Sequence, residues 1–450
     1  MIRGSGASFL FSVTTVPAIS KIVEKLVHTQ LTAYLTHQNL FSEEQHGFME
    51  KHSTCTALLT MTEQILSGMD SSQISILTLI DLSRCFDVID HEILLKKLEL
   101  LQITTGWFKS YLQDHIQRVK IGENLSEPAR ISIGTFQGTC LGPLLSNIAT
   151  NDLACHIPSE INGFKVTLVR YADDCQLAIT GPRNRIDEMR TSLELVLEIM
   201  SQWFQQHGML VNAGKTGLIV CGDRRKLTRI EQTPSIMFMG QQLGCKSAVK
   251  NLGVMMDSQL GWESHVKLIC DRCFGILIGL AHAKHMLPRD VLPRLIDSLV
   301  FSQLRYCIQV FGSANSTCFG KIQSVFNFAA RVLSGRRKYD HISDVLRQLG
   351  WLNASQFLVY SDLCLLYKVL TSGRPRALYE MFRFNHEVNQ RETRQSNHLA
   401  VTRPRTNHGK RTFCYRASQL YNNHTGYFNE LIDIPWSMFK TIAREIAMNT

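Results

Sequence analysis

Three aspartates whose carboxylates could share a cation stand out in this 450-residue chain. Asp173 and Asp174 are adjacent, and two apolar runs rich in β-branched residues flank them. This pattern predicts a hairpin over residues 165–180 with both carboxylates at its tip. Asp81 ends a buried-strand pattern over residues 74–80, 92 residues before Asp173. Adjacent carboxylates repel each other and need either water or a cation, and for a lone Asp-Asp turn water is the more common answer.

A loop with two glycines, residues 136–143, lies between these carboxylates and is predicted to open a helix. Gly138 and Gly142 would let the backbone approach a ligand closely, and Pro143 suits the first turn of a helix. Together with Asp81, this loop favours a functional site over a solvated turn.

Four short motifs follow one another at the spacing of a polymerase palm domain. They resemble the motifs of the reverse transcriptase of a non-LTR (LINE-type) retrotransposon of the jockey-like kind, and they are residues 81–87, 137–138, 141–143 and 171–174. The resemblance extends from about Val13 to the C-terminus. Further matching segments are residues 45–48, 52–54, 90–95, 107–112 and 212–216.

The resemblance implies an RNA-directed DNA polymerase that extends a DNA 3′-hydroxyl primer along an RNA template with dNTPs. It implies two Mg²⁺ ions, which prefer carboxylate oxygens, held by Asp81, Asp173 and Asp174. Lys215 matches the family lysine proposed to protonate pyrophosphate, the general-acid role. Without the family, a solvated surface lysine is an equal alternative.

Four further residues match positions beside the incoming nucleotide. Phe86 would abut the sugar C2′ and exclude a ribose hydroxyl, although a core phenylalanine is the alternative. Gln137 would lie beside the base pair being formed, and Gly138 follows it in the loop. Tyr171 precedes the aspartate pair on the predicted hairpin.

Apolar periodicity predicts the elements that must position these residues. In the first helix, one apolar face is expected to pack, and it comprises Ile19, Ile22, Val23, Leu26, Val27 and Leu31. Helices are expected over residues 18–37, from about 53, over 90–101 and over 182–207. Strands are expected over residues 74–82, 130–133 and 218–221.

The resemblance implies an α+β fold, a right-hand polymerase with fingers and palm, in which an antiparallel sheet is packed with helices. A helical thumb and a C-terminal extension follow. The expected divisions are fingers in 1–70, the catalytic palm in 71–222, a linker and helical thumb in 223–335, and a basic C-terminal extension in 336–450.

The region beyond residue 222 shows one strand pair within 236–256 and then mainly helical patterns. These helices are expected over residues 262–285, 289–311, 319–334 and 354–371. Basic clusters at 335–338, 403–405 and 410–411 are interleaved with aromatic residues that could stack on bases, namely Tyr339, Phe413, Tyr415 and Tyr421. Ordinary solvated loops are the alternative.

The net charge of +10 is distributed unevenly. Residues 1–200 carry 16 Lys and Arg against 22 Asp and Glu, a net of −6, whereas residues 201–450 carry 32 against 16, a net of +16. An acidic half joined to a basic half suggests that the second holds a polyanion and the first performs the chemistry. A merely soluble basic surface is the alternative.

The 13 cysteines are scattered through apolar segments, which favours a reduced intracellular protein. Thr14, Thr15 and Pro17 interrupt the apolar patch near the N-terminus, so we expect a protein that is not secreted, and we expect it in the nucleus and cytoplasm. Zinc is disfavoured at Cys270 and Cys273, because one long helix would bring only some of the nearby histidines to the same face. No apolar run of 18 residues occurs, so we expect no membrane span.

Three positions depart from the family pattern. Phe11 and Met49 stand where relatives commonly carry a cationic side chain, and Phe136 stands where they usually carry proline. These departures leave open a degenerate or co-opted, catalytically weak RNA-binding remnant. Another palm polymerase, an RNA-copying RNA polymerase or a maturase, is a further alternative that Phe86 argues against. We expect no endonuclease before Met1, and we expect integration to use an existing nick or a separate endonuclease.

Overall fold

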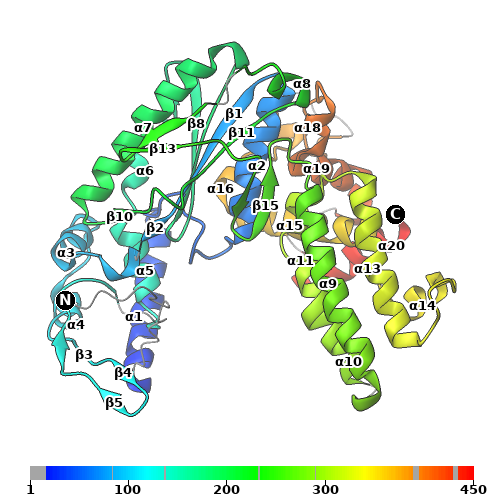
Figure 1. Ribbon diagram of the computed structural model, residues 1–450, viewed down its shortest axis with the longest axis horizontal. Coiled ribbons are helices and arrows are strands. Elements are labelled where there is room, and N and C mark those ends of the chain that lie inside the picture. The colour runs from blue at the N-terminus through cyan, green and yellow to red at the C-terminus, as the bar shows by residue number, and fades with distance from the viewer. Residues whose placement is uncertain are drawn as a thin grey trace.

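The computed structural model describes residues 17–83, 85–135, 138–231, 234–288, 290–388, 395–428 and 434–450. These residues form an arch with an antiparallel sheet at its crown and an arm on either side (Figure 1). One arm carries α1 (Ala18–His37) and α3 (His91–Leu100). The other arm carries α9 (Glu263–Ala283) and α13 (Ser316–Ser334). The two helical flanks therefore lie on opposite sides of the sheet.

The central sheet has five antiparallel strands in the order β11-β1-β9-β8-β7. The predicted hairpin is confirmed as β8 (Phe164–Tyr171) and β9 (Asp174–Gly181), which are joined by a two-residue turn. The strand before Asp81 is β1 (Ile74–Ile80), and it pairs with β9 on one side and β11 (Gly217–Cys221) on the other. At the far edge, β7 (Glu160–Ile161) pairs with the start of β8.

Both faces of β1 are buried. Successive side chains of a strand point to opposite sides of the sheet, so the residues of β1 pack into two different cores. Ile74 and Ile76 belong to the apolar core that contains α7 (Ile186–Gln206). Leu77 belongs instead to the core that contains α2 (Thr54–Asp70). A strand covered on both faces must be apolar throughout, which explains the nearly continuous apolar run in its sequence.

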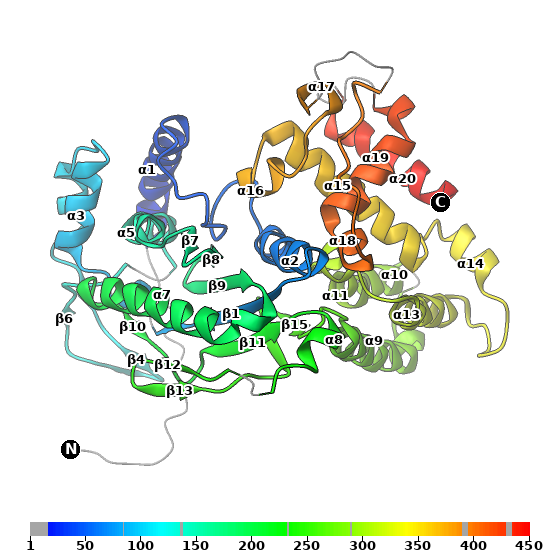
Figure 2. The ribbon, with the colours of Figure 1, turned by 90° about the horizontal axis from the view of Figure 1, so that it is seen from above.

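Helix α2 is buried around most of its circumference and connects the sheet to the C-terminal helices. Ser53 begins it with a capping box, in which the Ser53 hydroxyl accepts from Thr56 N and the Thr56 hydroxyl accepts from Ser53 N. Figure 2 shows α2 between the strands and α18 (Asn407–Arg411) with α19 (Phe413–Asn423). A helix that is buried on most sides needs hydrogen-bond partners for its buried polar side chains as well as apolar contacts.

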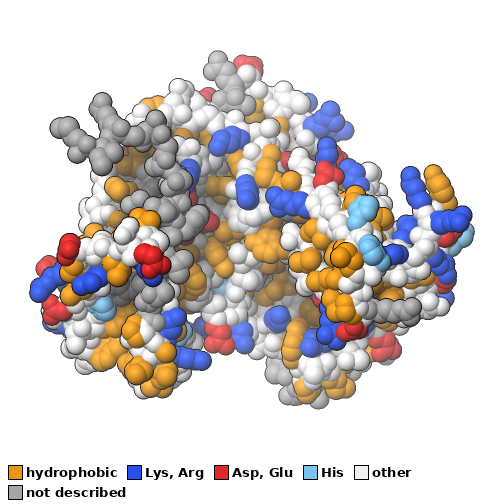
Figure 3. Space-filling model, turned by 60° about the horizontal axis from the view of Figure 1, so that its bottom comes forward, with side chains coloured by type: hydrophobic (Ala, Val, Ile, Leu, Met, Phe, Trp, Pro, Cys, Tyr) orange, Lys and Arg blue, Asp and Glu red, His pale blue; other side chains and the backbone are white. Residues whose placement is uncertain are grey.

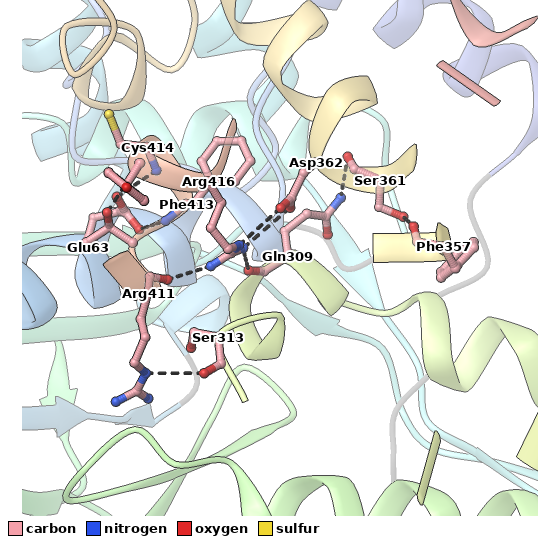
Figure 4. A network of polar contacts seen from close by, with 12 residues as sticks. Glu63, Gln309, Ser313, Phe357, Ser361, Asp362, Arg411, Phe413, Cys414 and Arg416 are labelled. Carbon is pink, nitrogen blue, oxygen red and sulfur yellow. Dashed lines mark hydrogen bonds and ion pairs between the residues drawn. The ribbon is translucent and has the colours of Figure 1, made fainter. Parts of the chain in front are cut away.

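Two acidic side chains of α2 bind the backbone of this C-terminal segment. Buried Glu63 accepts hydrogen bonds from Phe413 N at 2.5 Å and Cys414 N at 3.1 Å (Figure 4). Asp70 accepts from the backbone N–H groups of Arg405 and Thr406 at 3.1 and 2.7 Å. These carboxylates satisfy donors at helix starts that have no partner within the helix. Burial raises the pKa of Glu63 to about 7.

A second buried contact extends this junction. Arg416 on α19 donates to Asp362 Oδ2 at 3.2 Å, and the Asp362 side chain is only 1% exposed. Arg416 also donates to the Gln309 carbonyl at 2.8 Å (Figure 4). The largest apolar core consequently runs from Ala57 in α2 to Ile446 in the last helix. Helix α2 and the C-terminal helices are thus packed into one interior.

The remaining elements have the following bounds. Those before the hairpin are β2 (Leu82–Ser83), the 3₁₀ turn Cys85–Asp87, α4 (Gly106–Leu112), β3 (Ile116–Gln117), β4 (Lys120–Ile121), β5 (Asn124–Leu125), β6 (Ala129–Arg130), α5 (Gly142–Ala149) and α6 (Leu153–His156). Those after it are the 3₁₀ turn Arg183–Arg185, β10 (Leu210–Val211), α8 (Arg224–Leu227), the 3₁₀ turn Lys284–Met286, α14 (Ser343–Gln348), α15 (Ala354–Ser372), α16 (Arg376–Tyr379), α17 (Asn385–Val388), the 3₁₀ turn Thr425–Tyr427 and α20 (Trp436–Asn449). Within the described ranges, no helix combines the length and the apolar character needed to cross a bilayer.

Two sequence predictions about the second half are wrong. The region 236–256 holds two hairpins and not one strand pair: β12 (Ile236–Phe238) with β13 (Gln241–Leu243), and β14 (Ala248–Asn251) with β15 (Val254–Asp257). Tight turns with positive φ at Gly240 and Gly253 close them.

The helix predicted over 289–311 is interrupted. Its described part comprises α10 (Val291–Leu295), a π-helical stretch (Ile296–Phe301), α11 (Ser302–Arg305) and α12 (Ile308–Phe311). Cys307 between the last two has a φ of 56°, which an α-helix does not contain.

The C-terminal aromatic residues also differ from expectation. Phe413 and Tyr421 are buried in the apolar core, where they cannot stack on bases. Arg411 donates to the backbone carbonyls of Ser313 and Leu260. This part of the basic region therefore stabilises the fold, whereas Tyr339 is 89% exposed.

We predict that Glu63→Ala destabilises the chain by about 2–4 kcal/mol, because it leaves two buried N–H groups at the start of α19 without an acceptor. Urea denaturation of the full chain measures this loss. Glu50→Ala is the control, since the Glu50 side chain is exposed and its ion pair with exposed Lys51, at 3.3 Å, lies at the surface. Equal stability of both variants would show that the Glu63 contacts do not hold α19 in place.

The pKa of Glu63 also predicts a pH dependence. Burial raises it from 4.5 to about 7, so the folded chain binds more protons at this site than the unfolded chain between those values. The stability that this group contributes is complete below pH 4.5 and is lost as the pH rises through about 7. Glu63→Gln should therefore show a flatter decline of unfolding free energy over this window. Parallel profiles for the two proteins would contradict the prediction.

Candidate active site

The three aspartates meet at one end of the central sheet. Ile80, the last residue of β1, pairs with Cys175 near the start of β9, so Asp81 follows β1 beside the hairpin turn. The turn consists of Ala172 and Asp173, because Tyr171 pairs with Asp174 across the hairpin. The antiparallel register of β1 and β9 thus brings together carboxylates that are 92 residues apart in sequence.

The charges of these carboxylates affect one another. Burial, the charge of Asp173 and the charge of Asp81 raise the pKa of Asp174 to about 6, although its side chain still reaches solvent. Burial and the charge of Asp81 also raise the pKa of Asp173. Mutual repulsion at this level is relieved by a proton or by a cation. The site is consequently one in which bound positive charge is favourable.

Lys215 contacts this group of carboxylates. Its Nζ lies 3.6 Å from Asp81 Oδ2, with 69% of the lysine side chain and 33% of the aspartate side chain exposed. The turn that carries it is fixed by Asn212, whose backbone N donates to the Asp81 carbonyl at 2.9 Å. Lys215 therefore lies beside the carboxylates on a constrained turn. Its ion pair with Asp81 is exposed and contributes little to stability.

Phe86 lies on the short 3₁₀ turn after Asp81 and is half-buried. Its ring makes an edge contact with the exposed ring of Phe48, with centroids 6.1 Å apart. Its carbonyl accepts from Thr135 N at 2.6 Å, which ties this turn to the segment before the glycine loop. Phe86 is thus not among the buried residues of the apolar cores.

The glycine loop is described only from Gly138 onward, and Phe136 and Gln137 lie outside the described residues. Gly138 has a φ of 85°, a conformation that favours glycine. Buried Glu24 on α1 accepts from Cys140 N at 2.6 Å and from Leu141 N at 3.4 Å. The loop is therefore fastened to α1 immediately before α5.

Glu24 carries no signal in the sequence, because the apolar periodicity of α1 points to a different face from the one that packs. Of the six apolar residues expected to pack, Ile19, Ile22, Val23 and Leu26 are exposed, whereas Leu31 is buried and Val27 packs against the core. The buried residues of α1 are Glu24, Leu31 and Leu35, which recur at helical spacing. Apolar periodicity gives no weight to a buried carboxylate that binds a loop.

The described residues contain no group of three His, Cys, Asp or Glu side chains arranged to hold a metal ion. The aspartates nevertheless offer carboxylate oxygens, the donors that Mg²⁺ prefers, and burial together with neighbouring carboxylate charge raises the pKa values of Asp173 and Asp174. Cys270 and Cys273 lie within α9, and both are buried in the apolar core with His265 nearby on the same helix.

The face at the open end of the arch is hollowed between the two flanks (Figure 3). Hydrophobic and uncharged surface lines much of the hollow, and Lys and Arg side chains lie around it. A concave surface with cations around it suits a large anionic ligand.

Three relatives are RNA-directed DNA polymerases of mobile elements of Drosophila melanogaster. The probable enzyme from transposon BS is 28% identical over 72% of this chain and 36% of its own length. The enzyme from mobile element jockey is 25% identical over 74% of this chain and 36% of its own, and the probable enzyme from transposon X-element is 26% identical over 72% and 35%. This chain therefore spans just over a third of the length of the curated relatives it matches.

Solved structures of telomerase give weaker likenesses. Telomerase from Candida albicans in complex with a fragment of telomeric RNA is 14% identical, covering 80% of this chain and 58% of that chain at a TM-score of 0.35. Apo telomerase from Candida tropicalis is 12% identical, covering 80% and 61% at a TM-score of 0.36. Scores this low do not establish a shared fold.

The family model described as reverse transcriptase (RNA-dependent DNA polymerase) matches residues 10–255, more than half of the chain. That stretch includes all three aspartates and Lys215. The chain belongs to the reverse transcriptase family, and the relatives described above are RNA-directed DNA polymerases of Drosophila mobile elements.

Proposed function

We propose that this chain is the RNA-directed DNA polymerase of a non-LTR retrotransposon and adds deoxynucleotides to a DNA 3′-hydroxyl primer along an RNA template. The observation that carries the proposal is the convergence of Asp81, Asp173 and Asp174 at one end of the central sheet, with raised pKa values for the last two. Membership of the reverse transcriptase family supports the same reading.

Asp81, Asp173 and Asp174 would hold the divalent cations, two Mg²⁺ ions in our proposal. When bound, such cations neutralise phosphate charge and favour ionisation of the attacking hydroxyl. The chain contributes the position of the carboxylates, since β1, β8 and β9 are buried beneath them and restrict their movement.

Lys215 is the proposed general acid. Its ammonium lies 3.6 Å from Asp81 Oδ2, within reach of the site, and its exposure leaves it free to turn towards a leaving pyrophosphate. There it would donate a proton to the departing oxygen and limit the build-up of negative charge. Its contact with Asp81 keeps the ammonium near the reacting group before substrate binds.

Phe86, Gln137, Gly138 and Tyr171 are the proposed nucleotide-binding residues. The half-buried Phe86 ring, in contact with Phe48, has the bulk to exclude a ribose 2′-hydroxyl. Gly138 allows close approach of the backbone through its positive φ. Tyr171 is half-buried at the end of β8, one residue before the turn.

The architecture proposed for this function has fingers in 1–70, a palm in 71–222, a linker and helical thumb in 223–335 and a C-terminal extension in 336–450. The net charge of +16 on residues 201–450 supports binding of the RNA template and the DNA primer there. A separate endonuclease would provide the primer end.

The remnant hypothesis rests on Phe11, Met49 and Phe136, of which only Met49 lies within the described residues. Met49 lines a small cavity together with His52 and Arg374. Burial lowers the pKa of His52, and the charge of Arg374 contributes to that shift. A guanidinium from a distant segment thus lies beside the loop in which Met49 stands. We therefore favour an active polymerase.

We predict that Asp81→Asn and Asp173→Asn each reduce Mg²⁺-dependent extension of oligo(dT) on poly(rA) by at least about 10²–10³-fold, because each removes charge from the cation site. Binding of the RNA–DNA hybrid should remain, since carboxylates repel phosphates. Asp187→Asn on the exposed side of α7 is the matched control. Undiminished extension by either site variant would exclude its carboxylate from the mechanism.

We also predict that Phe86→Val admits ribonucleotides, because a smaller side chain removes the obstacle to the 2′-hydroxyl. The measurement is the ratio of kcat/KM for dNTP and NTP, which should fall by about 10-fold or more. Phe86→Tyr keeps the ring and should keep the ratio. An unchanged ratio in Phe86→Val would assign Phe86 a packing role with Phe48 only.

A further inference from the structure

The turn that carries Asp173 depends on a segment that lies far from it in sequence. Residues 44–46 run beside the end of β8, where β7 no longer covers that strand. Arg170 N donates to the Glu44 carbonyl at 2.7 Å, and His46 N donates to the Arg170 carbonyl at 2.8 Å. These bonds make residues 44–46 a short parallel addition to the edge of β8 at the active-site end.

The side chain of Gln45 continues this pairing into the turn. Its Oε1 accepts from Ala172 N at 2.9 Å, and its Nε2 donates to the Ala172 carbonyl at 3.3 Å. In a two-residue turn the backbone N–H and carbonyl of Ala172 face away from β9. The side-chain amide of Gln45 therefore takes the place of the backbone of a residue in a neighbouring strand. Gln45 is 3% exposed, so water does not substitute for it.

Ala172 is the residue that most needs such support. Its φ of 56° lies in the left-handed region, which a residue with a Cβ rarely adopts without compensation. Most hairpin turns of this length use glycine or asparagine there. The bonds from Gln45 hold this backbone conformation, and Asp173 is the next residue in the chain.

Gly47 allows the segment to approach so closely. A Cβ at this position would lie 2.2 Å from Ala172 N, which no side chain can tolerate. Gly47 N also donates to Gln45 Oε1 at 2.8 Å, which fixes the rotamer of the amide. Asn147 on α5 donates to the Gly47 carbonyl at 2.9 Å, so the same segment is held from the opposite side.

We propose that Gln45 is a positioning residue that sets the Ala172–Asp173 turn and thereby the placement of the Asp173 and Asp174 carboxylates. The inference rests on the proposed polymerase function for its catalytic consequence. Its structural basis is independent of that function, since the bonds join Gln45 to the backbone of the turn and not to a reacting group.

The test compares Gln45→Met with Gln309→Met in the full chain. Both changes replace a glutamine that donates to a backbone carbonyl, and Gln309 donates to Ser361 at 3.2 Å in the C-terminal half (Figure 4). Gln45→Met should lower kcat by about 10–100-fold, the cost typical of a small misplacement of reacting groups, with hybrid affinity within about 2-fold of the unmodified chain. Gln309→Met should leave kcat within about 2-fold.

A second variant separates the reach of the amide from its polarity. Gln45→Asn keeps the amide but shortens the side chain by one carbon, so it should lower kcat about as much as Gln45→Met. Full activity in Gln45→Asn would show that the position needs only a buried polar group, and it would overturn the proposal. Circular dichroism of each variant at the assay temperature checks that equal fractions are folded.

Binding of Mn²⁺ to the chain without nucleic acid, measured by electron paramagnetic resonance, gives a readout apart from activity. Gln45→Met should bind Mn²⁺ about 10-fold more weakly, and Gln309→Met should bind it normally. Normal kcat and Mn²⁺ binding in Gln45→Met, with activity lost in Asp81→Asn, would overturn the positioning role and leave the proposed function intact. Normal extension by Asp81→Asn would overturn the proposed carboxylate site and with it the catalytic role of Gln45, whereas no extension by the unmodified chain would overturn the proposed function itself.

Discussion

The repulsion among Asp81, Asp173 and Asp174 is the interaction on which the rest of the site depends. Like charges repel one another, so the backbone beneath the three carboxylates must resist their separation. The sheet meets this requirement by pairing β1 with β9 through seven residue positions, from Ile74 to Ile80, and by burying both faces of β1. The raised pKa of Asp174 shows the electrostatic cost of this arrangement.

The structure distributes support for this site over segments that are distant in sequence. Gln45 bonds the turn, Glu24 bonds the loop before α5, and Asn147 bonds Gly47. Each contact satisfies backbone or side-chain polar groups that burial would otherwise leave without partners. The same principle operates at Glu63, which joins α2 to α19. The active-site sheet and the C-terminal helices therefore share one interior.

Local sequence patterns were sufficient to predict the elements whose periodicity, start or turn is marked by their own residues. The bounds of α1 and the capped starts of α2 and α3 follow from helical periodicity and from Ser53 and Asp90. The hairpin follows from two β-branched runs around a short turn. Failures occurred where a single backbone angle intervened, as at Cys307, whose φ of 56° divides the helix predicted over 289–311. Residue type alone gives no warning of that conformation, since cysteine rarely adopts it.

The sequence by itself determined the family, and it predicted the three aspartates and Lys215 as site residues, because motif residues and their spacing can be read directly from the sequence. It also determined that β1 must be buried on both faces. Only the tertiary structure decided which face of α1 packs inward and which acidic residues bind loops. Such contacts form between side chains and backbone groups that folding brings together. Almost every residue carries the same backbone groups, so a pattern of residue types does not show which of them a side chain will bind. Gln45 belongs to this second class, since its partner is the backbone of Ala172.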